Sequence, residues 1–133
     1  SGPEIDSEQF SNTPENVEFT GFTENPFPYY KGSDLVITAG GHGTILESLS
    51  FGLPVLSFPD KKHVEQENNA TVLEEEGYGK RMSYLTGPEV ILAYIKEILE
   101  GEEYYKKTRR LRELAEELDG PVAVRKFLEE KVK

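Results

Sequence analysis

Cysteine is absent from the 133-residue sequence, and histidine occurs only twice. Without cysteine the chain can hold no disulfide, no thiolate-bound zinc and no thiol nucleophile, and two histidines leave little room for a histidine-rich metal site. No apolar run approaches the roughly 18 residues that a membrane-spanning helix needs. The sequence also does not open with the basic and apolar segments of a signal peptide. We therefore expect a cytoplasmic protein without a bound metal.

Basic residues are missing from residues 1–30, which carry six Asp and Glu side chains. The whole chain has a formal net charge of −10. Such a charge repels the phosphate backbone of nucleic acids, so we expect no nucleic-acid partner. The basic run over residues 106–112 has acidic neighbours on both sides, which favours a solvated helix face over an anion-binding surface.

The pattern of apolar residues predicts one α/β domain over residues 17–133, after an irregular segment over residues 1–16. Continuous apolar runs over 35–38 and 55–58 predict strands that are buried on both faces, as in a parallel sheet flanked by helices. The remaining predicted elements are short strands over 17–20 and 80–85, a loop over 23–32, helices over 44–51 and 64–76, and three helices that begin at Pro88, near Tyr104 and at Pro121.

A glycine-rich turn, Gly40-Gly41-His42-Gly43, lies between the strand at 35–38 and the helix that follows it. Glycines let a ligand approach the backbone closely, and the first N–H groups of a helix attract an anion, so this arrangement suits a phosphate. The turn matches neither the dinucleotide fingerprint nor the phosphate loop that ends in Gly-Lys-Ser/Thr. From these residues alone, a phosphate site and a simple tight turn both remain open.

Thr44 and Glu47 have the spacing of a capping box, in which each side chain satisfies a backbone N–H group of the other residue. That interpretation needs no ligand. Alternatively, Glu47 lies one turn inside a phosphate-binding helix, where its carboxylate can accept hydrogen bonds from the hydroxyls of a ribose.

A second polar segment, over residues 65–70, follows the strand at 55–58. In open parallel sheets, ligands bind beyond the carboxyl ends of the strands, where both this segment and the glycine turn are expected. Its acids and amides suit the hydroxyls of a sugar. They also suit the positive end of a helix dipole, which is the simpler explanation for such residues.

Taken together, these segments resemble one family. The ordered series over residues 17–118 is similar to the nucleotide-sugar-binding, C-terminal half of a GT-B glycosyltransferase, a Rossmann-like domain. The similarity is to the UDP-glycosyltransferases and to the bacterial enzyme that adds N-acetylglucosamine to the lipid-linked peptidoglycan precursor. The residues at family spacing are Gly41, Thr44, Glu47, Gly52, Pro54, Pro59, Gln66, Asn69 and Ala70.

The resemblance implies a donor-binding role for residues in three segments. Glu47 corresponds to the acid that binds the ribose, the turn over residues 41–44 to the diphosphate site, and Phe22 to the position that contacts the uracil. Glu65 and Gln66 correspond to the pair that binds the donor sugar. The full predicted donor site is Phe22, Gly41, His42, Gly43, Thr44, Glu47, Glu65, Gln66 and Asn69.

The resemblance also implies a reaction. A GT-B enzyme transfers a hexose or N-acetylhexosamine from a UDP-sugar to an acceptor hydroxyl, without a metal or other cofactor. Its acceptor site and catalytic base lie on an N-terminal half, so we expect this chain to need such a domain or a separate partner subunit and to be inactive alone. Relatives also have one or two β-α units ahead of residue 17, so we expect a domain truncated at its N-terminus. A lipid-linked acceptor would place the protein at the cytoplasmic membrane face.

Two other functions stay open. The chain could be a non-catalytic module that binds nucleotide sugars or a protein. A UDP-N-acetylglucosamine 2-epimerase shares the architecture, but such enzymes have a Thr-Glu-Arg-Pro-Glu run where this chain has Pro59-Asp60-Lys61-Lys62. The epimerase is therefore the weakest of the alternatives.

Overall fold

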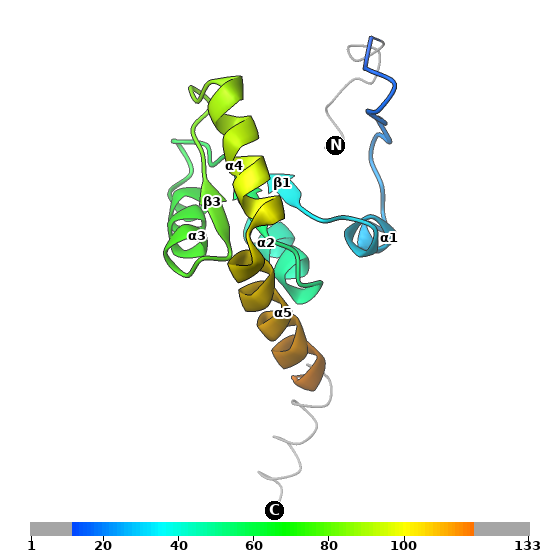
Figure 1. Cartoon of the computed structure of the whole chain (residues 1–133), viewed down its shortest axis with the longest axis vertical. Coiled ribbons are helices and arrows are strands. Elements are labelled where there is room, and N and C mark those ends of the chain that lie inside the picture. The colour runs from blue at the N-terminus through cyan, green and yellow to red at the C-terminus, as the bar shows by residue number, and fades with distance from the viewer. Residues whose placement is uncertain (1–11, 119–133) are drawn as a thin grey trace, which may run out of the picture.

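The computed structural model describes residues 12–118, with five helices and three strands (Figure 1). The predicted helix after Pro121 and most of the predicted irregular segment 1–16 lie outside the described residues. In chain order the elements are α1 (Phe27–Lys31), β1 (Val36–Thr38), α2 (His42–Ser50), β2 (Val55–Ser57), α3 (Val64–Glu75), β3 (Gly79–Arg81), α4 (Pro88–Glu100) and α5 (Glu102–Glu117).

The strands form a parallel sheet in the order β1-β2-β3. Val36 pairs with Val55, and Thr38 pairs with Ser57. Parallel neighbours need a crossover connection, and α2 and α3 provide the two crossovers. The predicted parallel sheet flanked by helices is therefore confirmed.

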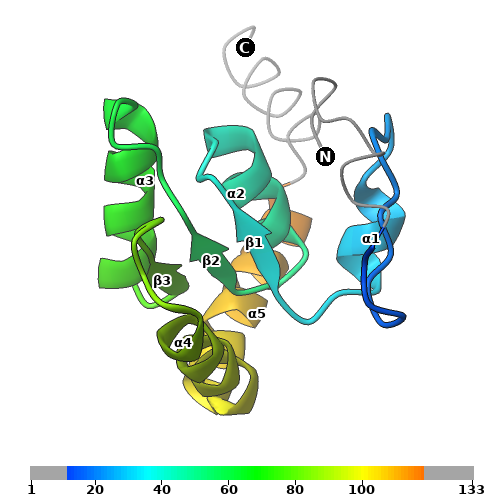
Figure 2. The same cartoon turned by 90° about the horizontal axis from the view of Figure 1, so that it is seen from above.

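Helices cover both faces of the sheet, which explains why β2 is apolar without alternation. Val55 packs with Ile45 and Leu49 of α2 and Leu73 of α3. Leu56 packs on the other face with Met82, which follows β3, and with Ile98 of α4. Figure 2 shows α2 and α3 on one side of the strands and α4 on the other. Val55 and Leu56 are both fully buried, as expected for a strand covered on two sides.

The edge strand β1 is less well covered than β2. Ile37 stands opposite Leu56 in the register and therefore shares its face of the sheet, yet the side chain of Ile37 is 56 % exposed. Within residues 12–118, β1 pairs with β2 alone. The prediction that the strand at 35–38 is buried on both faces is therefore wrong, and it holds for β2 only.

Several predicted elements differ from the structure, three of them outside the glycine turn. Residues 17–20 form no strand: the N–H of Val17 bonds to the carbonyl of Pro14 in a turn, and no neighbouring strand in the described part of the chain pairs with this segment. The predicted loop over 23–32 contains α1, because prolines fit the first turn of a helix. The last strand is shorter than predicted and covers Gly79–Arg81.

Helix α5 is tied to the turn that follows α2. Thr108 is fully buried, and its hydroxyl donates a hydrogen bond to the carbonyl of Gly52 at 2.8 Å. Gly52 has a φ of +75°, the left-handed conformation that glycine adopts after a helix end. The contact anchors the junction between α2 and β2 from outside the sheet.

No helix within residues 12–118 combines the length and apolar character needed to cross a membrane.

Candidate functional site

The glycine turn and the start of α3 both lie beyond the carboxyl ends of the strands. Thr38 ends β1 beside Ser57, which ends β2, and the two helices α2 and α3 begin within a few residues of these points. The carboxyl ends of parallel strands are where open α/β sheets bind ligands. The two polar segments predicted from the sequence thus lie together at the carboxyl end of the sheet.

Gly40 is the residue that makes the turn. Its φ is +93°, which disfavours any residue with a side chain, and a Cβ atom here would lie 2.7 Å from the Oγ of Ser57. Ser57 is itself fully buried at the end of β2, and its hydroxyl has no hydrogen-bond partner among the described residues. The close approach of Gly40 to Ser57 sets the direction in which the chain leaves β1.

The N-terminus of α2 is open. Gly41 is the N-cap, and no side chain within residues 12–118 caps the helix. A Cβ atom at Gly41 or Gly43 would meet nothing within 4 Å, and His42 is exposed. The first N–H groups of a helix have no partner within it, so these groups are accessible to a ligand.

The capping box predicted for Thr44 and Glu47 does not form. Because Gly41 is the N-cap and α2 begins at His42, two residues earlier than predicted, Thr44 is the third residue of the helix and cannot cap it. Glu47 is left without a capping role. Its carboxylate instead accepts a hydrogen bond from the hydroxyl of Tyr30 on α1, at 3.1 Å.

Glu65 and Gln66 at the start of α3 have different surroundings. Glu65 is exposed in the first turn of the helix. The Oε1 atom of Gln66 accepts a hydrogen bond from the backbone N–H of Asp60 at 3.0 Å, which fixes the loop that follows β2 and leaves the Nε2 group of Gln66 outside that bond.

Asn69 reaches back to the glycine turn. Its Nδ2 group donates a hydrogen bond to the carbonyl of Gly40 at 3.2 Å. Asn69 and His42 also line one small cavity of about 190 Å³ between α2 and α3. The structure therefore brings Asn69 together with the turn, but its amide supports the backbone there.

Phe22 lies in the extended segment ahead of α1 and is 63 % exposed. The predicted contact of Phe22 with the uracil stays a prediction. Within the described residues, no three His, Cys, Asp or Glu side chains gather as a potential metal site.

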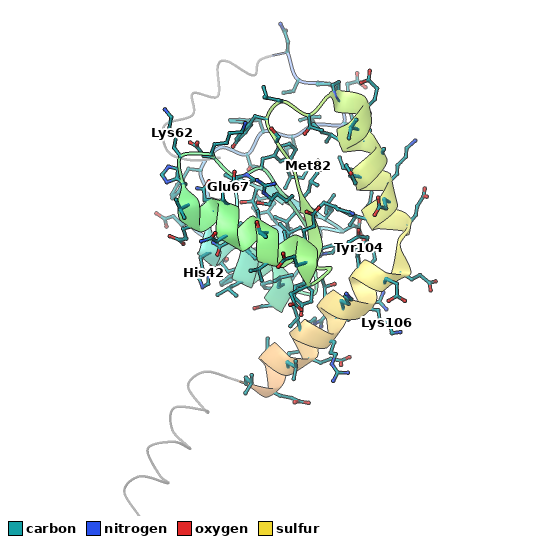
Figure 3. All side chains as sticks on the ribbon, turned by 90° about the vertical axis from the view of Figure 1, so that its left-hand side faces the viewer. His42, Lys62, Glu67, Met82, Tyr104 and Lys106 are labelled. Carbon is teal, nitrogen blue, oxygen red and sulfur yellow. The ribbon has the colours of Figure 1, made fainter. Side chains whose placement is uncertain are left out.

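Two polar contacts near the site were not anticipated from the sequence. Glu67 forms an ion pair with Arg81 at the end of β3, in which the Arg81 Nε lies 2.8 Å from a Glu67 carboxylate oxygen; Figure 3 shows Glu67 on α3, with Lys62 just ahead of the helix. The Tyr30–Glu47 hydrogen bond is the other. No sequence motif predicts either contact, because each contact joins residues from separate elements.

Comparison with known proteins identifies the family. The family model for the glycosyltransferase family 28 C-terminal domain matches residues 2–119. The chain belongs to this glycosyltransferase domain family. A glycosyltransferase of Methanosarcina mazei is 85% identical over 131 residues, which is 98% of this chain and 35% of that protein. The chain thus spans about a third of the length of that relative.

Two further proteins are similar to this chain, one in sequence and one in fold. The UDP-N-acetylglucosamine–N-acetylmuramyl-(pentapeptide) pyrophosphoryl-undecaprenol N-acetylglucosamine transferase of Rickettsia bellii is 38% identical over 72 residues, covering 53% of this chain and 20% of that enzyme. The calicheamicin glycosyltransferase CalG4 superposes with a TM-score of 0.73 at 22% identity, covering 84% of this chain and 29% of that one. The predicted fold, the C-terminal half of a GT-B glycosyltransferase, is confirmed.

Proposed function

We propose that the glycine turn, α2 and the start of α3 form the donor site of a glycosyltransferase that uses a UDP-sugar. The sugar transferred is a hexose or an N-acetylhexosamine, and it goes to an acceptor hydroxyl. The observation that carries the proposal is the open N-terminus of α2, with Gly41 and Gly43 unobstructed and Glu47 farther along the helix.

The diphosphate would bind at the turn. Three features support this: the uncapped N–H groups of α2, the helix dipole behind them, and the absence of any atom within 4 Å of a Cβ placed at Gly41 or Gly43. The same groups would stabilise the charge that develops on the departing UDP, so the turn would serve catalysis as well as binding. No metal or other cofactor is needed for this step.

The nucleoside and the sugar would lie on either side of the diphosphate. Glu47 would accept hydrogen bonds from the ribose hydroxyls, and Phe22 would contact the base. Glu65, Gln66 and the start of α3 would contact the hydroxyls of the donor sugar, with the loop held in place by the Gln66–Asp60 bond.

The acceptor site and the catalytic base would come from an N-terminal domain or a partner chain. The name of the Rickettsia bellii relative specifies a lipid-linked acceptor, which supports a membrane-bound acceptor here as well. In such a case the protein would work at a membrane surface.

Titration of the chain with UDP, UDP-glucose and UDP-N-acetylglucosamine, followed by amide NMR shifts, tests the proposal. We expect shifts concentrated at residues 41–47, and tighter binding of the sugar conjugates than of UDP. Glu47→Gln should weaken UDP binding about ten-fold or more, because hydrogen bonds to a charged group are the stronger kind. Glu75→Gln, which removes the same charge from an exposed position of α3, is the matched control.

Two results would contradict the proposal. If residues 41–47 show no shifts with any of the three ligands, the turn is only a tight turn. If shifts occur but transfer is absent even with an N-terminal half supplied, the chain is a binding module. A turnover assay on the chain alone should detect no transfer.

A further inference from the structure

The contact between α1 and α2 carries an inference about how the ribose site is ordered. Tyr30 lies on α1, and its hydroxyl donates a hydrogen bond to the Oε2 atom of Glu47 at 3.1 Å. The bond is part-buried and joins residues 17 positions apart. It leaves the Oε1 atom of Glu47, and the second lone pair of Oε2, outside the contact.

The ring of Tyr30 is held independently of its hydroxyl. It stacks on Phe51 with ring centroids 5.5 Å apart and an interplanar angle of 27°. Glu47 and Phe51 are four residues apart at the end of α2, so they share one face of the helix. Tyr30 therefore contacts both residues of that face: its ring stacks on Phe51, and its hydroxyl bonds to Glu47.

A glutamate on a helix surface ordinarily has three flexible torsions, and fixing such a side chain costs roughly 1 kcal/mol or more of entropy. A carboxylate already oriented by a neighbour loses less freedom when it binds a ligand. The Glu47 carboxylate is oriented in this way, because the Tyr30 hydroxyl holds its Oε2 atom while its Oε1 atom lies outside that hydrogen bond.

We propose that Tyr30 is a positioning residue that orients the Glu47 carboxylate toward the two hydroxyls of a ribose and so makes the site select ribonucleotides over deoxyribonucleotides. This inference rests on the proposed function, in which Glu47 binds the ribose. Tyr30 does not itself touch the nucleotide. It acts through Glu47, and α1 is the element that brings it there.

The Tyr30→Phe variant isolates the hydroxyl, because the ring and its stacking on Phe51 remain. The matched control is Tyr29→Phe, which removes a hydroxyl from the neighbouring residue, whose side chain is 51 % exposed. Binding of UDP and of 2′-deoxy-UDP to the 133-residue chain is measured by calorimetry for the unchanged chain, both tyrosine variants and Glu47→Gln. Thermal unfolding of each variant reports any loss of fold.

We expect Tyr30→Phe to weaken UDP binding about three- to ten-fold, the range for one hydrogen bond, and to weaken 2′-deoxy-UDP, which keeps only the 3′-hydroxyl, by a smaller factor. The ratio of the two affinities should therefore fall in Tyr30→Phe and stay constant in Tyr29→Phe. A purely structural role would weaken both nucleotides equally, and that result overturns the inference.

The outcomes also separate the inference from the proposal on which it rests. If Glu47→Gln weakens UDP but Tyr30→Phe leaves the affinity ratio unchanged, Tyr30 is not a positioning residue and the donor site stands. If the unchanged chain does not bind UDP, the donor-site proposal fails and the role of Tyr30 fails with it.

Discussion

The side-chain amide of Asn69 on α3 donates a hydrogen bond to the backbone carbonyl of Gly40 in the glycine turn, with 3.2 Å between Nδ2 and O. The two residues are 29 positions apart in the sequence. The bond joins α3, the helix that follows β2, to the glycine turn that follows β1.

Replacing Asn69 with alanine should loosen the turn. We expect the free energy of unfolding to fall by about 1 kcal/mol, the usual contribution of one hydrogen bond, and UDP binding to weaken because the turn is less well ordered. Urea unfolding and a UDP titration measure the two effects. Asn68→Ala, at the neighbouring exposed position, is the control, and an equal loss in both variants would contradict a specific role for Asn69.

Two of the three glycines of the turn, Gly40 and Gly43, should respond in opposite directions to alanine. Gly40→Ala places a Cβ atom 2.7 Å from Ser57 Oγ and in a residue with φ of +93°, so it should destabilise the fold by roughly 1–3 kcal/mol. Gly43→Ala meets nothing within 4 Å inside a helix and should stabilise the fold by roughly 0.5 kcal/mol. Thermal unfolding compares them.

The same pair separates stability from binding. Gly43→Ala should weaken UDP binding even though it stabilises the fold, because its methyl group stands where the phosphate approaches the backbone. If Gly43→Ala binds UDP as tightly as the unchanged chain, the phosphate does not approach the turn at this residue.

The phenol of Tyr30 should ionise above the ordinary tyrosine range. Burial raises the pKa of Tyr30 most, and the hydrogen bond and charge of Glu47 raise it further. Since the folded-state pKa exceeds the unfolded value of about 10, the folded state keeps the proton longer. The associated stability is present below about pH 10 and is lost as the pH rises through the folded-state pKa.

Glu47→Gln should lower the pKa of Tyr30 without restoring the ordinary value, because burial remains. Ring-carbon NMR shifts of the tyrosines between pH 8 and pH 12, ranges chosen around the reference value, follow this titration. A pKa of Tyr30 that does not change in Glu47→Gln would show that the two side chains do not interact in solution.

The bond between Thr108 and Gly52 should contribute measurably to stability. Thr108→Val keeps the shape of the side chain but leaves the Gly52 carbonyl without its 2.8 Å donor. An unsatisfied buried group costs about 1–3 kcal/mol, so urea unfolding should show a loss of that size. Thr108→Ser retains the hydroxyl and should lose less; a larger loss in the serine variant would place the stabilisation in the methyl group instead.

The sequence predicts the elements that are defined by local pattern. The apolar runs around Ile37 and Leu56 identify two parallel strands, of which only β2 is buried on both faces. The glycines at 40, 52 and 77 mark turns where the structure has positive φ angles. The start of α2 could not be placed correctly, because Thr44 and Glu47 offer a capping pattern that competes with the cap at Gly41.

The polar contacts of the site could not be predicted in the same way. Asn69 has a position in the family series, yet whether its amide faces a ligand or the carbonyl of Gly40 depends on how α3 crosses the sheet. Likewise, Tyr30 belongs to an aromatic stretch that looks like a loop, and its contact with Glu47 follows only from the placement of α1 against Phe51. Such contacts are set by tertiary packing, for which the sequence has no local signal.

Within residues 12–118 one edge of β1 has no neighbouring strand, which has a consequence for handling the protein. A strand edge with free N–H and C=O groups is a template for pairing with another chain, and an apolar side chain such as Ile37 beside it strengthens the attraction. At the concentrations used for spectroscopy or crystallisation, edge-to-edge self-association would then compete with the monomer. A charged residue in place of Ile37 would oppose such pairing, as charges on natural edge strands do.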